Sequence, residues 1–415
     1  MNKKDIMEIK RRFKKDGCTF TRMCGCYVDA EKNKIVNFGQ TFLNLEDEEF
    51  YKYLEIAKKT LSGTVGNNLL TLDIPVEEEG AGGRQQFLMG LRESRLKNDD
   101  LVDRFYDMVI SNYDYTGNYL ILVFHDAYDV MTKTTDNNKL DESEEVYEYL
   151  LCAICPVSLS KPGLGYRADE NRIGPRIRDW VVGIPDTGFL FPAFHDRSSD
   201  IHSLLFYTRD AKEPHSEFME AGLGCGAKRT ATEQKNLFSH IVRHALGDND
   251  ENSNETLLDL QQKVSDYIDE QEVFVDEETG VILEGDELAK LMAETNISDD
   301  AAASIREAYT ENFRNQPPEA AHLIDTKALE ANARNRENDE LRAQIADLRQ
   351  QVALHGESAS DDSGDDNIKT YDVVLRVKPE KVAQIKSRMI DGQKCLVIPM
   401  EENEHAAVNG VNTTV

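Results

Sequence analysis

Residues 119–130 read YLILVFHDAYDV, and residues 146–159 read VYEYLLCAICPVSL. Three further apolar segments follow: DWVVGIP (179–185), TGFLFPAF (187–194) and IHSLLFYT (201–208). Short apolar runs rich in β-branched and aromatic residues, bounded by turn-forming residues, are typical of strands. Helices precede these runs but do not alternate with them. The pattern therefore predicts an α+β fold with a mixed or antiparallel sheet and flanking helices, not a doubly wound fold.

The segments before this core predict helices and a hairpin. Residues 3–15 carry Ile6, Ile9 and Phe13 at helical spacing among lysines and arginines, which predicts a basic amphipathic helix. Residues 18–28 and 35–43 flank a polar turn, which predicts a β-hairpin. The stretch LEDEEFYKYLEIAKKTLSG (45–63) has acidic residues first and lysines last, in the order that suits a helix dipole.

Composition divides the chain into four predicted segments. Residues 1–220 form the sheet domain, and residues 221–326 form a mainly helical domain in which Thr230 and Glu233 make a capping box. Residues 327–367 are rich in Ala, Arg and Gln and end in GESASDDSGDD, which predicts a helical linker followed by a disordered hinge. Residues 368–415 predict a small β module with a turn at Asp391-Gly392.

The charge of the chain restricts its partners. Its 415 residues include 77 acidic and 48 basic side chains, for a formal net charge of -29. Such a field disfavours steering onto nucleic acid or anionic lipid, so we expect a protein partner. No stretch has the roughly 20 apolar residues of a membrane span. No signal peptide is visible, and the seven cysteines are irregularly spaced, so we expect a cytoplasmic protein with reduced thiols.

Two strand ends share the tripeptide Phe-His-Asp. LVFHD ends at residue 126 and PAFHD at residue 196. Imidazole and carboxylate groups at strand ends can act as acid and base, or can simply cap a loop. The catalytic candidates are therefore His125, Asp126, Asp129, His195, Asp196 and Arg197.

Arginines are dense in KPGLGYRADENRIGPRIRDW (161–180). Arginine suits bidentate contact with phosphate or carboxylate, although ion pairs with Asp169, Glu170 and Asp179 are the simpler explanation in so acidic a protein. A long loop between core strands is often functional. The ligand-binding candidates are Arg84, Arg167, Arg172, Arg176 and Arg178.

Two glycine-rich segments, GAGGRQQ (80–86) and Gly222-x-Gly224-x-Gly226, precede predicted helices. Backbone amides at such positions can hold phosphate. Neither segment has the Walker spacing, so a connection between elements is the alternative interpretation.

The remaining motifs predict no metal or covalent site. Cys24 and Cys26 share one face of a predicted strand, whereas Cys152 and Cys155 face opposite ways, which favours buried thiols over zinc. A partial calcium loop from Asp276 to Glu287 has Val281 where glycine is required. No cofactor is indicated.

Leu341, Ile345, Leu348 and Val352 follow coiled-coil spacing for about two heptads, where three or four would be persuasive. Self-association through residues 337–354 and a solvated helical spacer are the two interpretations.

Several long strings occur together in this chain: CTFTRMCGCYVDAEK, FLNLEDEEFYKYLEIAKKTLSG, GGRQQFLMGLRES, CAICPVSLSKPGLGY and PDTGFLFPAFHDRSSDIHSLLFY. With them the sequence closely resembles a bacterial family described as domain of unknown function 4317, over nearly its whole length. The resemblance implies a bacterial cytoplasmic setting. It implies no catalytic residue.

These observations favour a non-enzymatic protein-interaction or regulatory factor. The alternative is a hydrolase or phosphate-handling enzyme, with the two His-Asp corners at one site and the arginine-rich loop covering it. Whether the chain is an enzyme is left open by its sequence.

Overall fold

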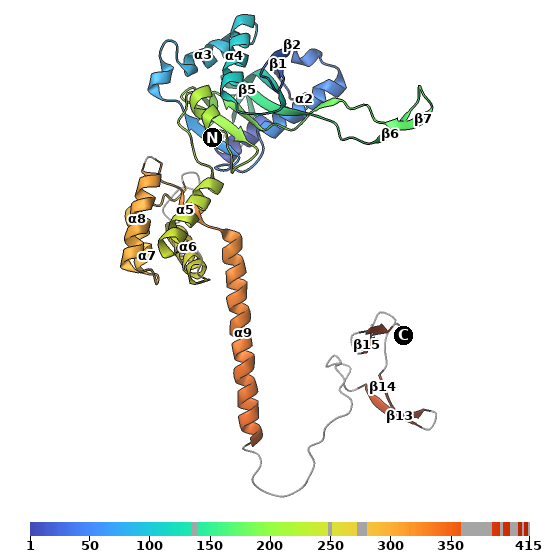
Figure 1. Ribbon diagram of the computed structural model, residues 1–415, viewed down its shortest axis with the longest axis vertical. Coiled ribbons are helices and arrows are strands. Elements are labelled where there is room, and N and C mark those ends of the chain that lie inside the picture. Colours follow the sequence, from blue (N-terminus) through green and yellow to red (C-terminus); the bar gives the residue numbers. More distant parts are fainter. Residues whose placement is uncertain are drawn as a thin grey trace. The chain divides into compact units, whose positions relative to one another are not determined.

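The computed structural model describes residues 1–133, 139–247, 251–271, 280–314, 316–357, 384–390, 393–398, 406–408 and 411–413. The chain forms two compact units, Met1–Glu337 and Asn338–Val415 (Figure 1). The four-part division expected from composition stays a prediction.

The first unit is built on an antiparallel sheet with the strand order β2-β1-β4-β5-β9-β12-β3, and β8 also pairs with β5. The strands are β1 (Phe20–Val28), β2 (Lys34–Thr41), β3 (Leu69–Asp73), β4 (Asn118–Lys133), β5 (Lys139–Leu159), β8 (Trp180–Val182), β9 (Thr187–Phe191) and β12 (Ser203–Thr208). Two short hairpins lie outside it, β6 (Leu164–Arg167) with β7 (Arg172–Pro175) and β10 (Ala193–His195) with β11 (Ser198–Asp200).

Both faces of the sheet are covered, because the central strands place apolar side chains alternately on each face. In β4, Ile121 and Val123 join one core cluster, while Leu122 and Phe124 join the other. The first face packs against α3 (Arg84–Glu93), α4 (Asp99–Asn112) and the π-helical turn η3 (Phe218–Gly222). The second face packs against α1 (Lys3–Arg11), η1 (Phe42–Asn44) and α2 (Asp47–Thr60).

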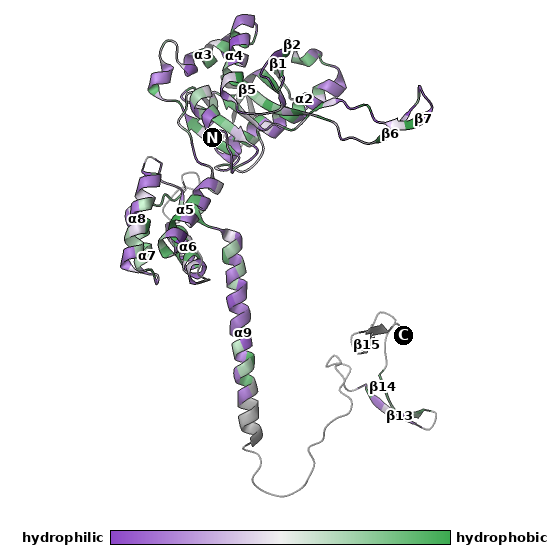
Figure 2. Ribbon diagram, viewed as in Figure 1, coloured by the Kyte–Doolittle hydropathy of each residue, from purple (hydrophilic) through white to green (hydrophobic). Residues whose placement is uncertain are grey.

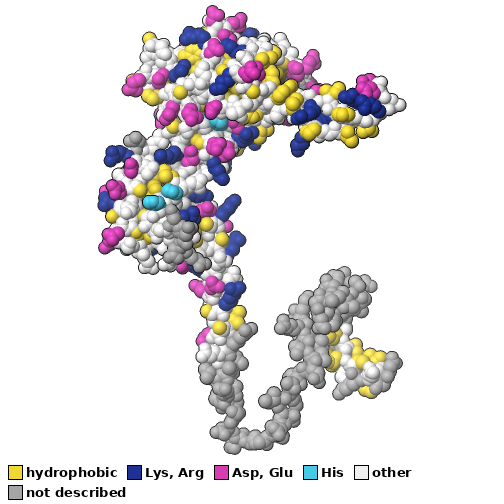
Figure 3. Space-filling view, in the orientation of Figure 1, with side chains coloured by type: hydrophobic (Ala, Val, Ile, Leu, Met, Phe, Trp, Pro, Cys, Tyr) yellow, Lys and Arg dark blue, Asp and Glu magenta, His cyan; other side chains and the backbone are white. Residues whose placement is uncertain are grey.

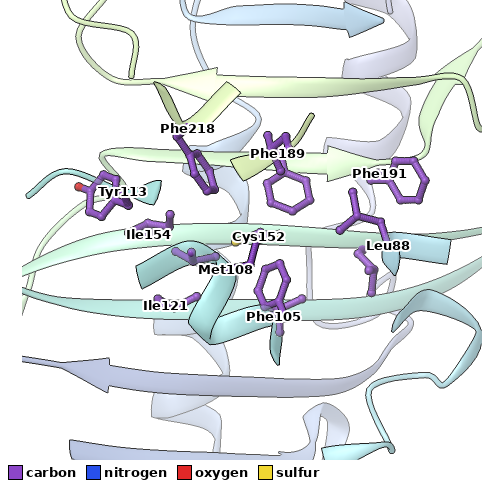
Figure 4. Packing of buried hydrophobic residues seen from close by; sticks show 14 of the residues in the cluster. Leu88, Phe105, Met108, Tyr113, Ile121, Cys152, Ile154, Phe189, Phe191 and Phe218 are labelled. Carbon is purple, nitrogen blue, oxygen red and sulfur yellow. The ribbon is translucent and has the colours of Figure 1, made fainter. Parts of the chain in front are cut away.

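The first core is dense in aromatic side chains. Figure 4 shows Phe105 and Met108 of α4 directed toward Ile121, Cys152 and Ile154 of the sheet, with Phe189, Phe191 and Phe218 beside them. Phe105 and Phe189 meet at a ring-centroid distance of 6.3 Å. Edge-to-face contacts of this kind add to the free energy gained from burial.

A helical bundle follows the sheet within the same unit. It contains α5 (Ala231–Leu246), α6 (Glu251–Gln271), α7 (Gly285–Ala293), α8 (Asp299–Phe313) and the 3-10 turn η4 (Ala320–Leu323). Phe238, Leu260, Leu288 and Tyr309 meet in its own buried cluster. The predicted capping box of α5 is confirmed, since the side chains of Thr230 and Glu233 each accept a hydrogen bond from the other residue's backbone N–H.

The last long helix is α9 (Thr326–Glu357). The second unit also contains two antiparallel strand pairs, β13 (Lys386–Ile390) with β14 (Gln393–Val397) and β15 (Ala406–Val408) with β16 (Val411–Thr413). β13 and β14 flank the expected Asp391-Gly392 turn, and that turn lies outside the described residues.

The α+β prediction is confirmed, and most predicted helices and strands occur within a few residues of their expected ends. One detail differs: the arginine-rich segment predicted as a loop contains β6 and β7. Asp276 of the calcium pattern and most of the expected hinge lie outside the described residues.

The tight packing of β9 on β5 leads to a stability prediction. A Cβ atom at Gly188 would lie 2.3 Å from the Cys152 carbonyl oxygen and 2.8 Å from Cγ2 of Thr60. Gly188→Ala should therefore lower the free energy of unfolding by about 1–3 kcal/mol, measured by urea denaturation. Gly90→Ala is the control. Gly90 lies within helix α3, and a Cβ atom added there would have no neighbouring atom within 4 Å. It should raise stability by about 0.5–1 kcal/mol. Equal effects of the two changes would contradict the packing described.

Candidate functional site

His125 lies inside the sheet domain with no exposed surface. Its Nδ1 is 2.6 Å from the Thr21 hydroxyl, and its Nε2 is 3.0 Å from a carboxylate oxygen of Glu148. A neutral imidazole satisfies both contacts, since Nε2–H donates to the carboxylate and Nδ1 accepts from the hydroxyl. Burial lowers the pKa of His125, although the Glu148 charge opposes that shift. The arrangement is that of a satisfied core histidine.

Asp126 points to the opposite face of the sheet, where it is 1% exposed. It accepts hydrogen bonds from the Tyr149 hydroxyl at 2.6 Å and the Thr19 hydroxyl at 2.5 Å, and it pairs with Arg12 at 3.3 Å. Arg12 also bonds Thr19 and stacks over an aromatic ring of β4. The Asp126 carboxylate thus attaches helix α1 to the sheet.

The second corner, at residues 195–197, is open to solvent. The side chains of His195 and Asp196 are 58% and 72% exposed and lie 3.5 Å apart. Arg197 pairs with Glu8 of α1 at 3.6 Å, and the same carboxylate accepts a hydrogen bond from the Tyr128 hydroxyl. Asp196 and Arg197 both have positive φ, so the chain turns sharply here.

The structure therefore brings part of the predicted set together. Asp126 and Arg197 both contact α1, through Arg12 and Glu8 respectively. His125 faces the α3–α4 side of the sheet instead, and Asp129 is exposed. Over the described ranges, no group of three or more His, Cys, Asp or Glu side chains is placed to hold a metal ion. The two histidines thus do not converge on one buried site.

The arginine-rich segment forms an arm made of β6, β7 and their connections, residues 160–179. Figure 1 shows it extended away from the sheet, and Figure 3 shows basic and apolar side chains along it. Its base is held by backbone bonds between Ser160 and Asp179 and between Gly163 and Arg176. A covering role of the arm over the His-Asp corners stays a prediction.

The pairing of β6 with β7 places the side chains of the arm on two faces. Tyr166 pairs with Ile173, and Leu164 pairs with Pro175, so these four share one face. Their exposure is high: 76% for Leu164, 64% for Tyr166 and 63% for Ile173. Ile177, Trp180, Val181, Val182 and Ile184, which follow in the chain, are exposed as well. Exposed apolar residues are common singly, but a contiguous group indicates an interaction surface.

The opposite face carries the arginines near the tip. Arg167 and Arg172 both pair with Glu170, which fits the ion-pair interpretation for these two. Arg176 and Arg178 are exposed, and the only side-chain hydrogen bond between them and the described residues joins Arg178 to the Ser160 carbonyl. Their guanidinium charges therefore have no carboxylate partner among the described residues.

Arg84 lies elsewhere, at the start of α3. Its guanidinium donates to the Ala221 carbonyl at 3.2 Å, and its backbone N–H donates to the Glu78 carboxylate at 2.7 Å. Glu78 thus occupies the position at the helix N-terminus that an anion would take in a phosphate loop. This geometry favours a structural connection for GAGGRQQ.

The second glycine segment packs onto the first. A Cβ at Gly224 would meet the side chains of Arg84 and Glu78, and the φ of Gly224 is +72°. Glycine is required here because the chain adopts a left-handed conformation at a close approach. Lys228 and Arg229, which follow it, bond the carbonyl oxygens of Thr71 and Asn312.

The cysteines of the sheet domain belong to its cores. Cys24, Cys26 and Cys152 join the first cluster, and Cys155 joins the second. Burial raises the pKa of the Cys26 and Cys225 thiols to about 12 and that of Cys18 to about 11. Such thiols are poor nucleophiles at neutral pH.

The coiled-coil seam lies on α9. Leu341, Ile345 and Leu348 are each roughly half exposed, among the mainly hydrophilic residues that Figure 2 shows along this helix. Self-association through residues 337–354 stays a prediction.

One buried polar cluster has no counterpart in the sequence analysis. Asp186, only 6% exposed, accepts from the Tyr113 hydroxyl at 2.8 Å and pairs with His215 at 2.9 Å and Arg209 at 2.6 Å. Burial pushes the pKa of Asp186 up, but these contacts outweigh it and hold the pKa below its usual value. In the sequence, Asp186 directly precedes a predicted strand, and this position alone gives little indication of a buried polar cluster. Its partners come from distant segments that the sequence does not connect to it.

Burial of His125 leads to a pH prediction. A depressed pKa in the folded state means that the unfolded chain binds the proton more tightly, so stability falls as pH drops below about 6.5. Urea denaturation of the wild type and of His125→Gln should show a smaller loss for the variant between about pH 7.5 and pH 5.5.

His202 gives a control of opposite sign. A hydrogen bond with Glu79 raises its pKa, so its contribution is present at low pH and lost as pH rises. His202→Gln should therefore steepen the loss on acidification. Identical pH profiles for His125→Gln and the wild type would show that His125 does not titrate as its burial implies.

Comparison with known proteins identifies the family. None of the curated proteins matches the chain. In the part of the chain that the structure describes, no helix is both long and apolar enough to cross a membrane. The family model described as Domain of unknown function (DUF4317) matches residues 1–411, as the sequence motifs predicted. The chain therefore belongs to the DUF4317 family.

Proposed function

We propose that this protein is a non-enzymatic protein-interaction factor of the bacterial cytoplasm, and that its arm (residues 160–179) docks onto an acidic surface of a partner protein. The observation that carries the proposal is the exposed apolar face formed by Leu164, Tyr166 and Ile173. Seven unpaired cysteines are compatible with a reducing compartment.

Binding to a partner would remove the free-energy cost of exposing the apolar side chains of the arm to water. An isolated two-stranded hairpin is marginally stable in water, and this one exposes large apolar side chains. Burying them against another protein gains about 25 cal/mol per Å² of apolar surface. Elsewhere in the sheet domain, tyrosine and phenylalanine side chains of comparable size lie inside the two cores.

The charge of the arm indicates the kind of partner. Lys161, Arg167, Arg172, Arg176 and Arg178 stand against Asp169, Glu170 and Asp179. This positive balance contrasts with the net charge of -29 for the whole chain. Arginine and aromatic residues are enriched where interfaces bind most tightly, and complementary charge increases specificity. A local acidic patch on a partner protein fits better than nucleic acid, because the extended row of phosphates would also face the acidic rest of the chain.

The hydrolase alternative has less support. His125 has no exposed surface, and both of its ring nitrogens already have partners. A general base must reach the proton that it removes, directly or through one water molecule. Of the six catalytic candidates, Asp129, His195 and Asp196 are exposed and could meet a substrate without rearrangement of the fold.

Affinity capture from native bacterial cytoplasm tests the proposal. The double change Tyr166→Ser and Ile173→Ser should remove the partner that the wild type recovers, since interface anchors contribute about 2 kcal/mol or more each. Ile35→Ser with Val36→Ser is the matched control, because these β2 side chains are 52% and 51% exposed. The purified partner should then bind the control as tightly as the wild type, measured by calorimetry.

Two results would count against the proposal. One is recovery of the same partner by the arm variant and the wild type. The other is turnover of a phosphorylated substrate that His125→Ala abolishes, with no partner recovered. The second result would favour the hydrolase alternative.

A further inference from the structure

A cleft of about 680 Å³ lies within the first unit, away from the arm. The start of α1 and the β3 region line one side, and residues of the helical bundle and its connection to the sheet line the other. The residues that matter for its chemistry are Lys3, Lys4, His195, Lys228, Arg229 and His322. Pockets for small molecules in proteins have volumes of about 300–1,000 Å³.

The charge in this cleft is opposite to that of the chain. Among the described residues, four cationic side chains line it, those of Lys3, Lys4, Lys228 and Arg229, and the one lining carboxylate is that of Glu319, 3.4 Å from Nε2 of His322. Over the whole chain, acidic residues outnumber basic ones by 77 to 48. A concave surface of one sign focuses the field and concentrates ligands of the other sign.

Two of the cations are held in place largely by neutral groups. The Lys228 ammonium donates to the Thr71 carbonyl at 2.7 Å, and the Arg229 guanidinium donates to the Asn312 carbonyl at 2.6 Å. Lys228 also pairs with the Asp73 carboxylate at 3.2 Å, and the side chain of Asp73 is 79% exposed. A carbonyl oxygen holds a cationic side chain in place without neutralising its charge, so the charge can still attract a ligand. Because these two side chains are already ordered, ligand binding would cost little further side-chain entropy.

The backbone amides at the start of α5 are already used. Ala231 N–H donates to the Gly66 carbonyl, and Thr232 N–H donates to the Asn67 side chain. Anion binding in this cleft would therefore depend on side-chain cations and not on the glycine segment before α5.

The cleft also has an apolar part. Val65, Leu69, Leu70, Ile282, Pro317 and Pro318 line it beside the cations. Small-molecule sites combine an apolar lining with a few polar groups that fix orientation. A ligand that fits this surface has an anionic end and a flat or apolar end.

We propose that this cleft binds a phosphorylated small molecule of nucleotide size. Several clustered cations match the multiple charges of a phosphate chain, and guanidinium groups match its geometry. The apolar lining would contact the rest of the molecule. A ligand held between β3 and residues 316–322 would stabilise the first unit by mass action.

Calorimetry on the full chain tests this with ATP, pyrophosphate and adenosine as probes. ATP should bind, and adenosine should bind at least about tenfold more weakly because it lacks charge. Pyrophosphate should compete with ATP. The thermal unfolding midpoint should rise with ATP concentration.

The cleft variants are Lys3→Glu and Arg229→Gln. A glutamate in the first turn of α1 favours the helix dipole, so Lys3→Glu should fold normally. Each change should weaken ATP binding by about tenfold. Lys14→Glu is the control, since this exposed lysine is close in sequence but does not line the cleft, and it should bind ATP as the wild type does.

Three results would overturn the proposal: no binding of ATP or pyrophosphate, equal binding of adenosine and ATP, or unchanged binding in both cleft variants. The arm variant Tyr166→Ser with Ile173→Ser should bind ATP normally. The test is therefore independent of the function proposed for the arm.

Discussion

The pairing of β4 with β5 is the constraint on which the rest of the structure depends. The register runs from Asn118 opposite Val157 to Val130 opposite Glu145, and both strands contribute buried side chains to both cores. Because the sheet is buried on both faces, successive residues in the buried part of this ladder face first one core and then the other. His125 and Asp126 are neighbours in sequence, and this alternation sends their side chains to opposite sides. The ladder thus separates the groups that a catalytic site at this corner would need.

The polar residues around the sheet then have a structural role. Helix α1 is attached to both corners, by Arg12 to Asp126 and by Glu8 to Arg197. Asp186 joins the start of β9 to the end of α4 and to His215. Breaking such a buried pair is costly because it leaves one charge uncompensated. These clusters hold elements in position, and they lie where the covering helices meet the sheet.

Two surfaces remain that the fold itself does not explain. The arm follows directly from β5, and the chain returns through β8, so residues 160–179 add no strand to the sheet. It exposes apolar and basic side chains in a strongly acidic molecule. The cleft gathers Lys3 and Lys4 of α1 and Lys228 and Arg229 of the connection to α5. Both surfaces are basic although the chain as a whole is acidic, and the ligands that we propose for them differ: a protein for the arm and a small phosphorylated molecule for the cleft.

The sequence by itself determined the α+β class, the family, most helices and strands, and the cap at Thr230, because these depend on local periodicity and on residues three or four positions apart. It also marked the arginine-rich segment, although not its strands, because short strands with two glycines have little period-two signal. Only the tertiary structure decided which side chains meet. The cleft combines Lys3, Lys228 and His322, and the Asp186 cluster combines Tyr113 with His215, from segments far apart in the chain. Such contacts are set by the packing of whole elements, and a residue pattern along one segment holds no information about them.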